Sequence, residues 1–176
     1  MRPARPLALL VLLALVTSLT GCSGAPNARA WASSVCTTLA PWRTEIGSLT
    51  KRTQQQMETA TTPRQAKENL MRLFGGAEDA SERARAGVVK AGVPDVDDGA
   101  QIAEGFTNSL AATRDAYARA RSGVEGLATA PAETFYQQVA KVVEQLQTDY
   151  QASSLDTGNL HSVELKSAFD EVSECR

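Results

Sequence analysis

The sequence predicts an all-α fold: an antiparallel, up-down four-helix bundle whose fourth column is broken into a longer helix and a short C-terminal helix. Apolar residues recur at steps of three and four through long stretches, which is the spacing of one helix face. Proline and glycine separate these stretches, and no convincing strand pattern interrupts them. The first three helices span about 43–50 Å each, and the last two, of about 31 and 16 Å, match them when laid end to end. Short links then make neighbouring columns antiparallel, and both chain ends lie at one end of the bundle.

The first helix is expected over residues 28–60. Pro41 lacks the N–H that a helix interior needs, so we expect a kink or a short break there. Trp42 continues the same face, which argues against a new element. The inward face holds Trp31, Val35, Leu39, Trp42, Ile46, Leu49, Thr53 and Met57.

The second helix is expected over residues 63–91. Thr62-Pro63 is a typical start, with a capping hydroxyl and a proline at the first helical position, and Gly92 is a typical stop. Gly75-Gly76 lowers helix stability by about 1 kcal/mol per glycine relative to alanine and is a candidate bend. Most inward residues are small, which lets a neighbouring helix approach closely: Ala66, Leu70, Leu73 or Phe74, Ala77, Ala80, Ala84, Val88 and Ala91.

The third helix is expected over residues 97–129. The acidic run before it fails as a calcium loop, because the twelfth position from Asp95 is Phe106 where an EF-hand needs a glutamate. Asp97 or Asp98 as N-cap explains the run better. Its inward face holds Ile102, Phe106, Leu110, Thr113, Tyr117, Ala120, Val124 and Leu127. Three arginines lie mainly off that face and predict a solvated flank rather than an anion site: Arg114, Arg119 and Arg121.

The fourth column begins at Ala130-Pro131. Turn-rich residues 152–162 break it, and a short helix over residues 163–173 follows. The inward positions are Phe135, Val139, Val142, Leu146 and Tyr150, then Leu165, Phe169 and Val172.

The N-terminal segment reads as a targeting signal. Arg2 and Arg5 precede an apolar run at residues 7–16, whose helical length of about 15 Å is half a bilayer core and fits a signal peptide. Leu19-Thr20-Gly21-Cys22 follows. This stretch resembles the lipobox of bacterial lipoproteins, with Leu19 at the −3 position and Cys22 as the modified +1 residue. The alternatives are an ordinary signal peptide with a chance cysteine and an uncleaved N-terminal anchor.

The resemblance implies three parts of the chain. Residues 1–21 are a cleaved signal peptide, residues 22–27 are a lipidated tether, and residues 28–176 are the helical domain. A diacylglycerol on Cys22 then holds the protein at the extracytoplasmic face of the cell membrane. Arginine outnumbers lysine and alanine is abundant, as in high-GC genomes, and the chain resembles small lipoproteins of actinobacteria, a resemblance that implies no activity.

The net charge of the chain argues against two classes of binding partner. The formal net charge is −2, and because residues 1–21 carry two arginines and no acid, the rest of the chain has a net charge of −4. This dispersed, mildly acidic charge argues against nucleic acid as a partner and against polybasic docking to a membrane. Membrane attachment is therefore expected to depend on the lipid.

Cys36 and Cys175 are the two remaining cysteines, and in an oxidising compartment they are expected to form a disulfide. They lie near opposite ends of the domain sequence, so the up-down bundle is the architecture that brings them together. Closing a loop of about 140 residues stabilises the fold by up to about 5 kcal/mol in the chain-entropy model. The alternative is a redox pair or a metal site, but the chain has no CxxC and a single histidine.

No reactive constellation is recognisable. His161 is the only histidine, it lies in the polar break, and no serine has a GxSxG context, so we expect a surface histidine. ExxH metal spacing and a phosphate-binding loop are absent from the sequence. We expect no catalytic residue, no metal and no cofactor. Trp31 and Trp42 are expected in core or membrane-proximal packing, with a partner anchor as the alternative.

Three functional hypotheses follow. The first is a lipid-anchored, non-enzymatic protein-interaction or structural module of the cell envelope, with an envelope protein as partner. The alternative is a carrier or sensor that holds a lipid or another apolar ligand between helices. The third, and least supported by the sequence, is an enzyme with an unfamiliar site.

Overall fold

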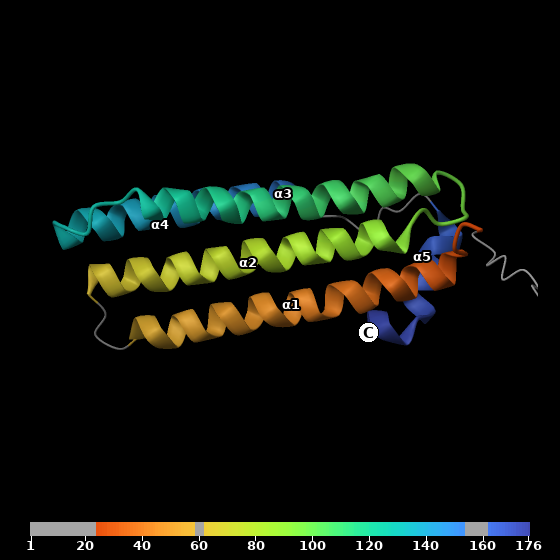
Figure 1. Ribbon diagram of the computed structural model, residues 1–176, viewed down its shortest axis with the longest axis horizontal. Coiled ribbons are helices and arrows are strands. Elements are labelled where there is room, and N and C mark those ends of the chain that lie inside the picture. The colour runs from red at the N-terminus through yellow and green to blue at the C-terminus, as the bar shows by residue number, and fades with distance from the viewer. Residues whose placement is uncertain (1–23, 59–61, 154–161) are drawn as a thin grey trace, which may run out of the picture.

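A computed structural model of the chain describes residues 24–58, 62–153 and 162–176. In these residues every regular element is helical. The elements are α1 (Ala28–Glu58), α2 (Pro63–Ala91), α3 (Gly99–Glu125), α4 (Ala132–Ser153), α5 (Val163–Glu171) and a closing 3₁₀ turn, η2 (Ser173–Cys175). Helices α1, α2 and α3 lie side by side and α4 runs behind α3 (Figure 1). This is the predicted up-down four-helix bundle with a fourth column broken between α4 and α5.

The four columns form an open arrangement. Helix α1 packs along α2, α2 along α3, and α3 along α4, whereas α4 only touches α2 and does not pack along α1. Helix α5 and η2 pack on α1. We call the end of the bundle that carries α5 the α5 end; α1 and α3 begin there and α2 finishes there (Figure 1). The opposite end is the far end.

Helix α2 begins and ends where the sequence predicts. The Thr62 side chain accepts a hydrogen bond from Gln65 N, and the Gln65 side chain accepts one from Thr62 N, which completes a capping box. At the other end Gly92 N donates to Val89 O. These contacts satisfy backbone groups that a helix terminus otherwise leaves without partners.

The small residues of α2 allow α1 to approach closely, as predicted. A Cβ on Gly87 would lie 2.5 Å from Thr38 Cγ2, and one on Gly76 would lie 2.9 Å from Leu49 Cδ1. Both separations are too short for a Cβ, so a larger residue at either position would force the facing side chain of α1 to move. Gly75-Gly76 does not interrupt α2, which is continuous through both residues.

The structure differs from the sequence prediction at Pro41 and, by more than two residues, at the end of α3. Helix α1 continues through Pro41, so the break considered there is absent. Helix α3 ends at Glu125 rather than near residue 129. Gly126 is the C-cap, and its N–H donates to Ser122 O. Lys67 Nζ of α2 also donates to Glu125 O at 2.6 Å and Leu127 O at 2.8 Å, which satisfies carbonyls at the end of α3.

The sequence prediction placed the N-cap of α3 correctly but was wrong about the side-chain hydrogen bond. Asp98 does occupy the N-cap position of α3, but its side chain makes no capping hydrogen bond. A capping residue normally has an extended backbone, whereas Asp98 has φ 57° and ψ 19°, in the left-handed region. Asp97 lies one residue outside the cap position.

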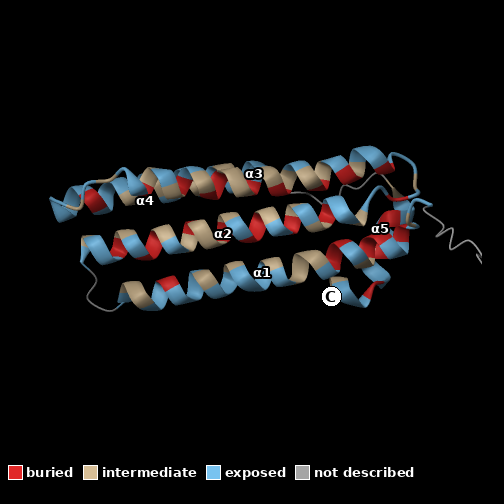
Figure 2. Cartoon of the chain, viewed as in Figure 1, coloured by how far each residue is buried: buried red, intermediate tan, exposed pale blue. Residues whose placement is uncertain are grey.

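Buried side chains form two cores along the bundle (Figure 2). The core at the α5 end joins α1, α2, α3 and α5, and its largest members include Trp31, Phe106 and Leu165. The core toward the far end joins α2 and α3 through Leu70, Phe74, Tyr117 and Val124, with partly buried residues of α1 and α4 at its edges. Because α1 and α4 do not close over this second core, its margins stay partly exposed.

Candidate functional site

The segment that enters α1 is fixed to the turn between α2 and α3. Asp95 N donates to Pro26 O at 2.8 Å, and Asn27 Oδ1 accepts from Ala30 N at 2.9 Å as the N-cap of α1. Trp31 Nε1 then donates to Gly92 O at 2.8 Å. These bonds make Pro26 part of the rigid α5 end.

Trp31 belongs to the core rather than to a contact surface. It is 0% exposed, and its ring meets Phe106 edge-on at 5.2 Å between centroids and Phe169 at 6.0 Å. Phe106 and Phe169 stack at 5.8 Å, which joins α3 to α5. Trp42 is half-buried and donates to Ser81 Oγ at 3.1 Å. The prediction of core packing for both tryptophans is confirmed, and the alternative partner-anchor role does not fit Trp31.

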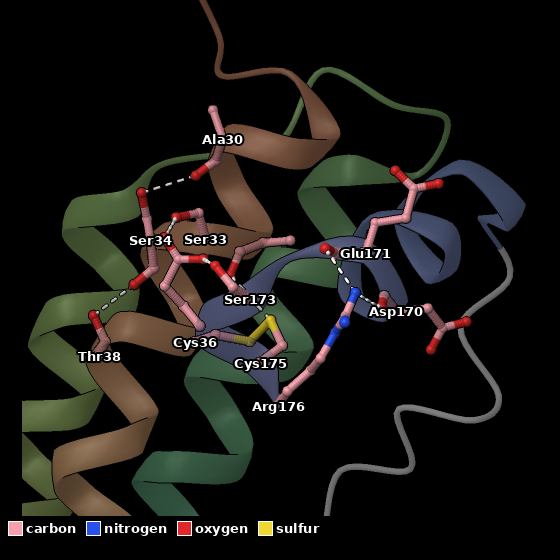
Figure 3. The surroundings of a disulfide bond; sticks show 12 residues. Ala30, Ser33, Ser34, Cys36, Thr38, Asp170, Glu171, Ser173, Cys175 and Arg176 are labelled. Atoms are coloured by element: carbon pink, nitrogen blue, oxygen red, sulfur yellow. Dashed lines mark hydrogen bonds between the residues drawn. A yellow bond between two sulfur atoms is a disulfide. The ribbon is translucent and has the colours of Figure 1, made fainter.

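Cys36 and Cys175 form the predicted disulfide (Figure 3). Their Cα atoms are 5.0 Å apart although 139 residues separate them in sequence. The bond joins α1 to η2, so it fastens the C-terminal segment to the α5 end. In the described structure both sulfur atoms form a disulfide and neither is a free thiolate that could bind a metal.

Polar contacts surround the disulfide. Ser33 Oγ donates to Glu174 Oε1 at 3.0 Å, and Arg29 pairs with Glu171 at 3.1 Å. Hydrogen bonds from the Ser173 side chain, from the backbone and from Ser33 lower the pKa of Glu174. Open depressions flank Arg29 and Glu171 on the surface. Paired charges and serine hydroxyls line them, and Ser33 and Ser173 both hydrogen-bond Glu174.

Exposed large hydrophobic side chains gather in two places among the described residues. The first, which we call the valine patch, consists of Val89, Val93 and Val163, which lie at the end of α2, just after it and at the start of α5. The second, the α4 stripe, consists of Tyr136, Val143 and Tyr150. Exposed apolar side chains that gather in one region favour a binding surface, whereas scattered single residues do not.

The α4 stripe lies beside the face that α4 uses internally. Val142 packs over Gly123 of α3, and Ser153 hydrogen-bonds Ser109 and, at 3.0 Å, Thr113. The stripe residues, spaced by seven, are each 39–43% exposed. On a helix of 3.6 residues per turn that spacing places them in one row.

Tyr150 belongs to both faces of α4. Its ring meets that of Tyr117 at 6.3 Å, and burial and the nearby Tyr150 raise the pKa of Tyr117 to about 12. Tyr117 therefore stays protonated near neutral pH and is unsuited to act as a base. The predicted inward position of Tyr150 is only partly correct, because α1 does not cover this side of α4.

The arginines of α3 form ion pairs between helices. Arg114 binds both Glu82 of α2 and Asp115 at 2.8 and 2.7 Å, and Arg85 also binds Glu82 at 2.7 Å. Hydrogen bonds from Arg85 and Arg114 lower the pKa of Glu82 to about 2, so this carboxylate stays ionised and cannot act as a general acid at neutral pH.

The other two arginines of α3 are paired in the same manner. Arg119 pairs with Asp149 of α4 at 2.8 Å, and Arg121 pairs with Glu78 of α2 at 3.2 Å. The solvated flank that the sequence predicts is thus a set of partly exposed ion pairs between α3 and its neighbours, and each contributes little to stability.

Two predicted residues lie outside the described residues: Cys22, the predicted lipid attachment site, and His161. The acidic run at residues 95–98 lies at the α5 end beside Pro26. In the parts of the chain that the structure describes, no three histidine, cysteine or acidic side chains are grouped to hold a metal ion. The structure therefore brings together only the disulfide pair among the predicted sites.

Sequence reasoning missed both apolar surfaces. The α4 stripe left a signal, since Tyr136, Val143 and Tyr150 recur every seven residues and widen the apolar arc of α4. The valine patch left none, because its members come from α2, the following turn and α5, and only the tertiary fold places them at one end.

No family model, curated protein or solved structure matches this chain. Each helix within the described ranges is too short or too polar to cross a membrane.

Proposed function

We propose that this protein is a lipid-anchored helical lipoprotein of the extracytoplasmic face of the cell membrane, and that it acts as a non-enzymatic protein-interaction module. The anchor is the diacylglycerol that the lipobox resemblance assigns to Cys22. The contact surface is the α4 stripe, and the partner is an envelope protein that presents an amphipathic helix.

The α4 stripe carries the proposal. Two tyrosines and a valine stand in one row on a helix that packs fully only on α3. Tyrosine is favoured at protein interfaces because it offers apolar area together with a polar hydroxyl. A row at spacing of seven suits a partner helix with apolar residues at matching positions.

The carrier alternative gains no support from α2. The space beside its small residues is filled: Leu49 of α1 lies against Gly76, Thr38 of α1 against Gly87, and Arg121 of α3 against Gly75. These residues serve close helix packing, which leaves the interaction module as the function that the geometry supports best.

The anchor is tested by intact-mass measurement of the protein extracted from membranes. The expected mass is that of a chain beginning at Cys22 with a diacylglycerol attached, and the Cys22→Ser variant should carry no lipid. An unlipidated wild-type chain would remove the anchor from the proposal.

The contact surface is tested by site-specific photocrosslinking in cells. A photoreactive residue at position 143 should capture one dominant envelope protein, identified by mass spectrometry. The matched control is Lys141, which is exposed on the opposite side of the same helix. Equal capture at both positions, or capture at neither, would contradict the role of the stripe.

A further inference from the structure

We propose that the α5 end of the bundle rests on the phospholipid bilayer through the valine patch, so that the rod stands on this end. This inference rests on the proposed lipid anchor and adds the orientation and the contact residues. Its first support is where the chain that leads to the anchor leaves the folded domain.

The exit point is fixed at Pro26. The carbonyl of Pro26 is held by Asp95 N at 2.8 Å, and Asn27 caps α1 immediately afterwards. Four residue steps separate Pro26 from Cys22. At about 3.3–3.6 Å per residue they reach at most about 14 Å, so the α5 end cannot move far from a lipid on Cys22.

Two members of the valine patch are connected to this exit point by neighbouring residues. Val163 is 83% exposed and borders the same depression as Asn27 and Ala28. Val93 lies between Gly92, which approaches Pro26, and Asp95, whose N–H donates to Pro26 O, and Val89 lies about one turn earlier in the chain. Val89 and Val93 are 54% and 46% exposed. The most exposed apolar side chain of the described residues thus lies where a short tether brings the domain to the bilayer.

The charges at this end favour an apolar contact over an electrostatic one. Asp95, Asp97 and Asp98 lie in the turn beside Val93, and Glu164 follows Val163. The nearby cations are Lys90, Lys166 and Arg29, and Arg29 is paired with Glu171, so acidic side chains remain in excess. Anionic headgroups would be repelled by the excess of acid, so a zwitterionic phosphatidylcholine surface is the appropriate probe.

Standing on this end separates the two apolar surfaces. Val142 lies over Gly123, which is 24 residues along α3 from Gly99, so Val143 is about 36 Å from the α5 end. The α4 stripe is then held away from the bilayer, in reach of a protein partner. A rod lying on its side would instead bring the stripe to the lipid, and the two orientations predict opposite contacts.

The test uses the full-length lipoprotein, reconstituted into phosphatidylcholine vesicles. A photoreactive residue is placed in turn at positions 93 and 163, at position 143, and at Ala128, an exposed residue of the far-end turn. We expect phospholipid adducts at positions 93 and 163 and only background at positions 143 and 128. Adducts at position 143 that match or exceed those at position 163, or no adduct at positions 93 and 163, would overturn the inference.

A second measurement uses unmodified side chains. Backbone amides of residues 92–97 should exchange hydrogen more slowly on vesicles than in the Cys22→Ser protein in solution, whereas those of residues 126–130 should not change. If the change in exchange rate between solution and vesicles is the same for residues 92–97 as for residues 126–130, the end-on contact is overturned. Intact mass on the same samples separates the failures: a lipidated chain without lipid contact at the valine patch refutes the orientation alone, whereas an unlipidated chain refutes the anchor and the orientation together.

Discussion

Removing the Cys36–Cys175 crosslink should lower the free energy of unfolding by about 3–5 kcal/mol. The bond closes a loop with a sequence separation of 139 residues, and the chain-entropy model gives about 5 kcal/mol for a loop of that length. Residual structure in the unfolded chain reduces this value. The loss is expected because the crosslink restricts the unfolded state, so the denaturant m-value should also rise when it is removed.

The assay is urea unfolding of the domain followed by circular dichroism, comparing the oxidised protein with the Cys36→Ala/Cys175→Ala variant. The reduced wild-type protein is the control, because it loses the bond while it keeps both sulfur atoms. A near-zero difference between oxidised and reduced protein would refute the entropic reasoning. If only the variant lost stability, the packing of Cys36, which is buried in α1, would be responsible instead.

Three further predictions concern packing and charge. Gly87→Ala should destabilise the fold by about 1–3 kcal/mol because its Cβ would lie 2.5 Å from Thr38 Cγ2. The control Gly105→Ala has open space around it and should stabilise α3 by up to about 1 kcal/mol, and thermal unfolding of the two variants tests both predictions. Leu165→Ala should cost about 2–5 kcal/mol since the side chain is fully buried, and Val163→Ala on the same helix should change stability by less than about 0.5 kcal/mol; equal effects in urea unfolding would contradict the placement of α5. Glu82→Gln should cost at most about 1 kcal/mol at pH 7, because the ion pairs are partly exposed. The folded pKa of Glu82, about 2, lies below its ordinary value of 4.5, so its contribution is complete above pH 4.5 and is lost as the pH falls toward 2; a wild-type advantage that grows in acid would refute this.

Local signals predicted the elements well where the stabilising contacts lie within a few residues. Helix α2 begins at Thr62-Pro63 and ends at Gly92 as expected, because a capping box and a C-terminal glycine act within one helical turn. The end of α3 was misjudged although a local signal, the C-cap residue Gly126, is present. Lys67, which is remote in sequence, adds hydrogen bonds to Glu125 O and Leu127 O that no local pattern predicts.

The sequence by itself determined the helical class, the up-down order and the pairing of Cys36 with Cys175, since helix periodicity, short links and two spare cysteines constrain one another. The tertiary structure alone decided which apolar residues remain uncovered. Helix α1 fits closely on α2 at Gly76 and Gly87 and leaves α4 without a neighbour on one side, so the α4 stripe is exposed. Val89, Val93 and Val163 come to the same end of the bundle only because the fold places α2, its following turn and α5 there. Periodicity reports which face of a helix is apolar, but burial depends on how closely another helix approaches that face.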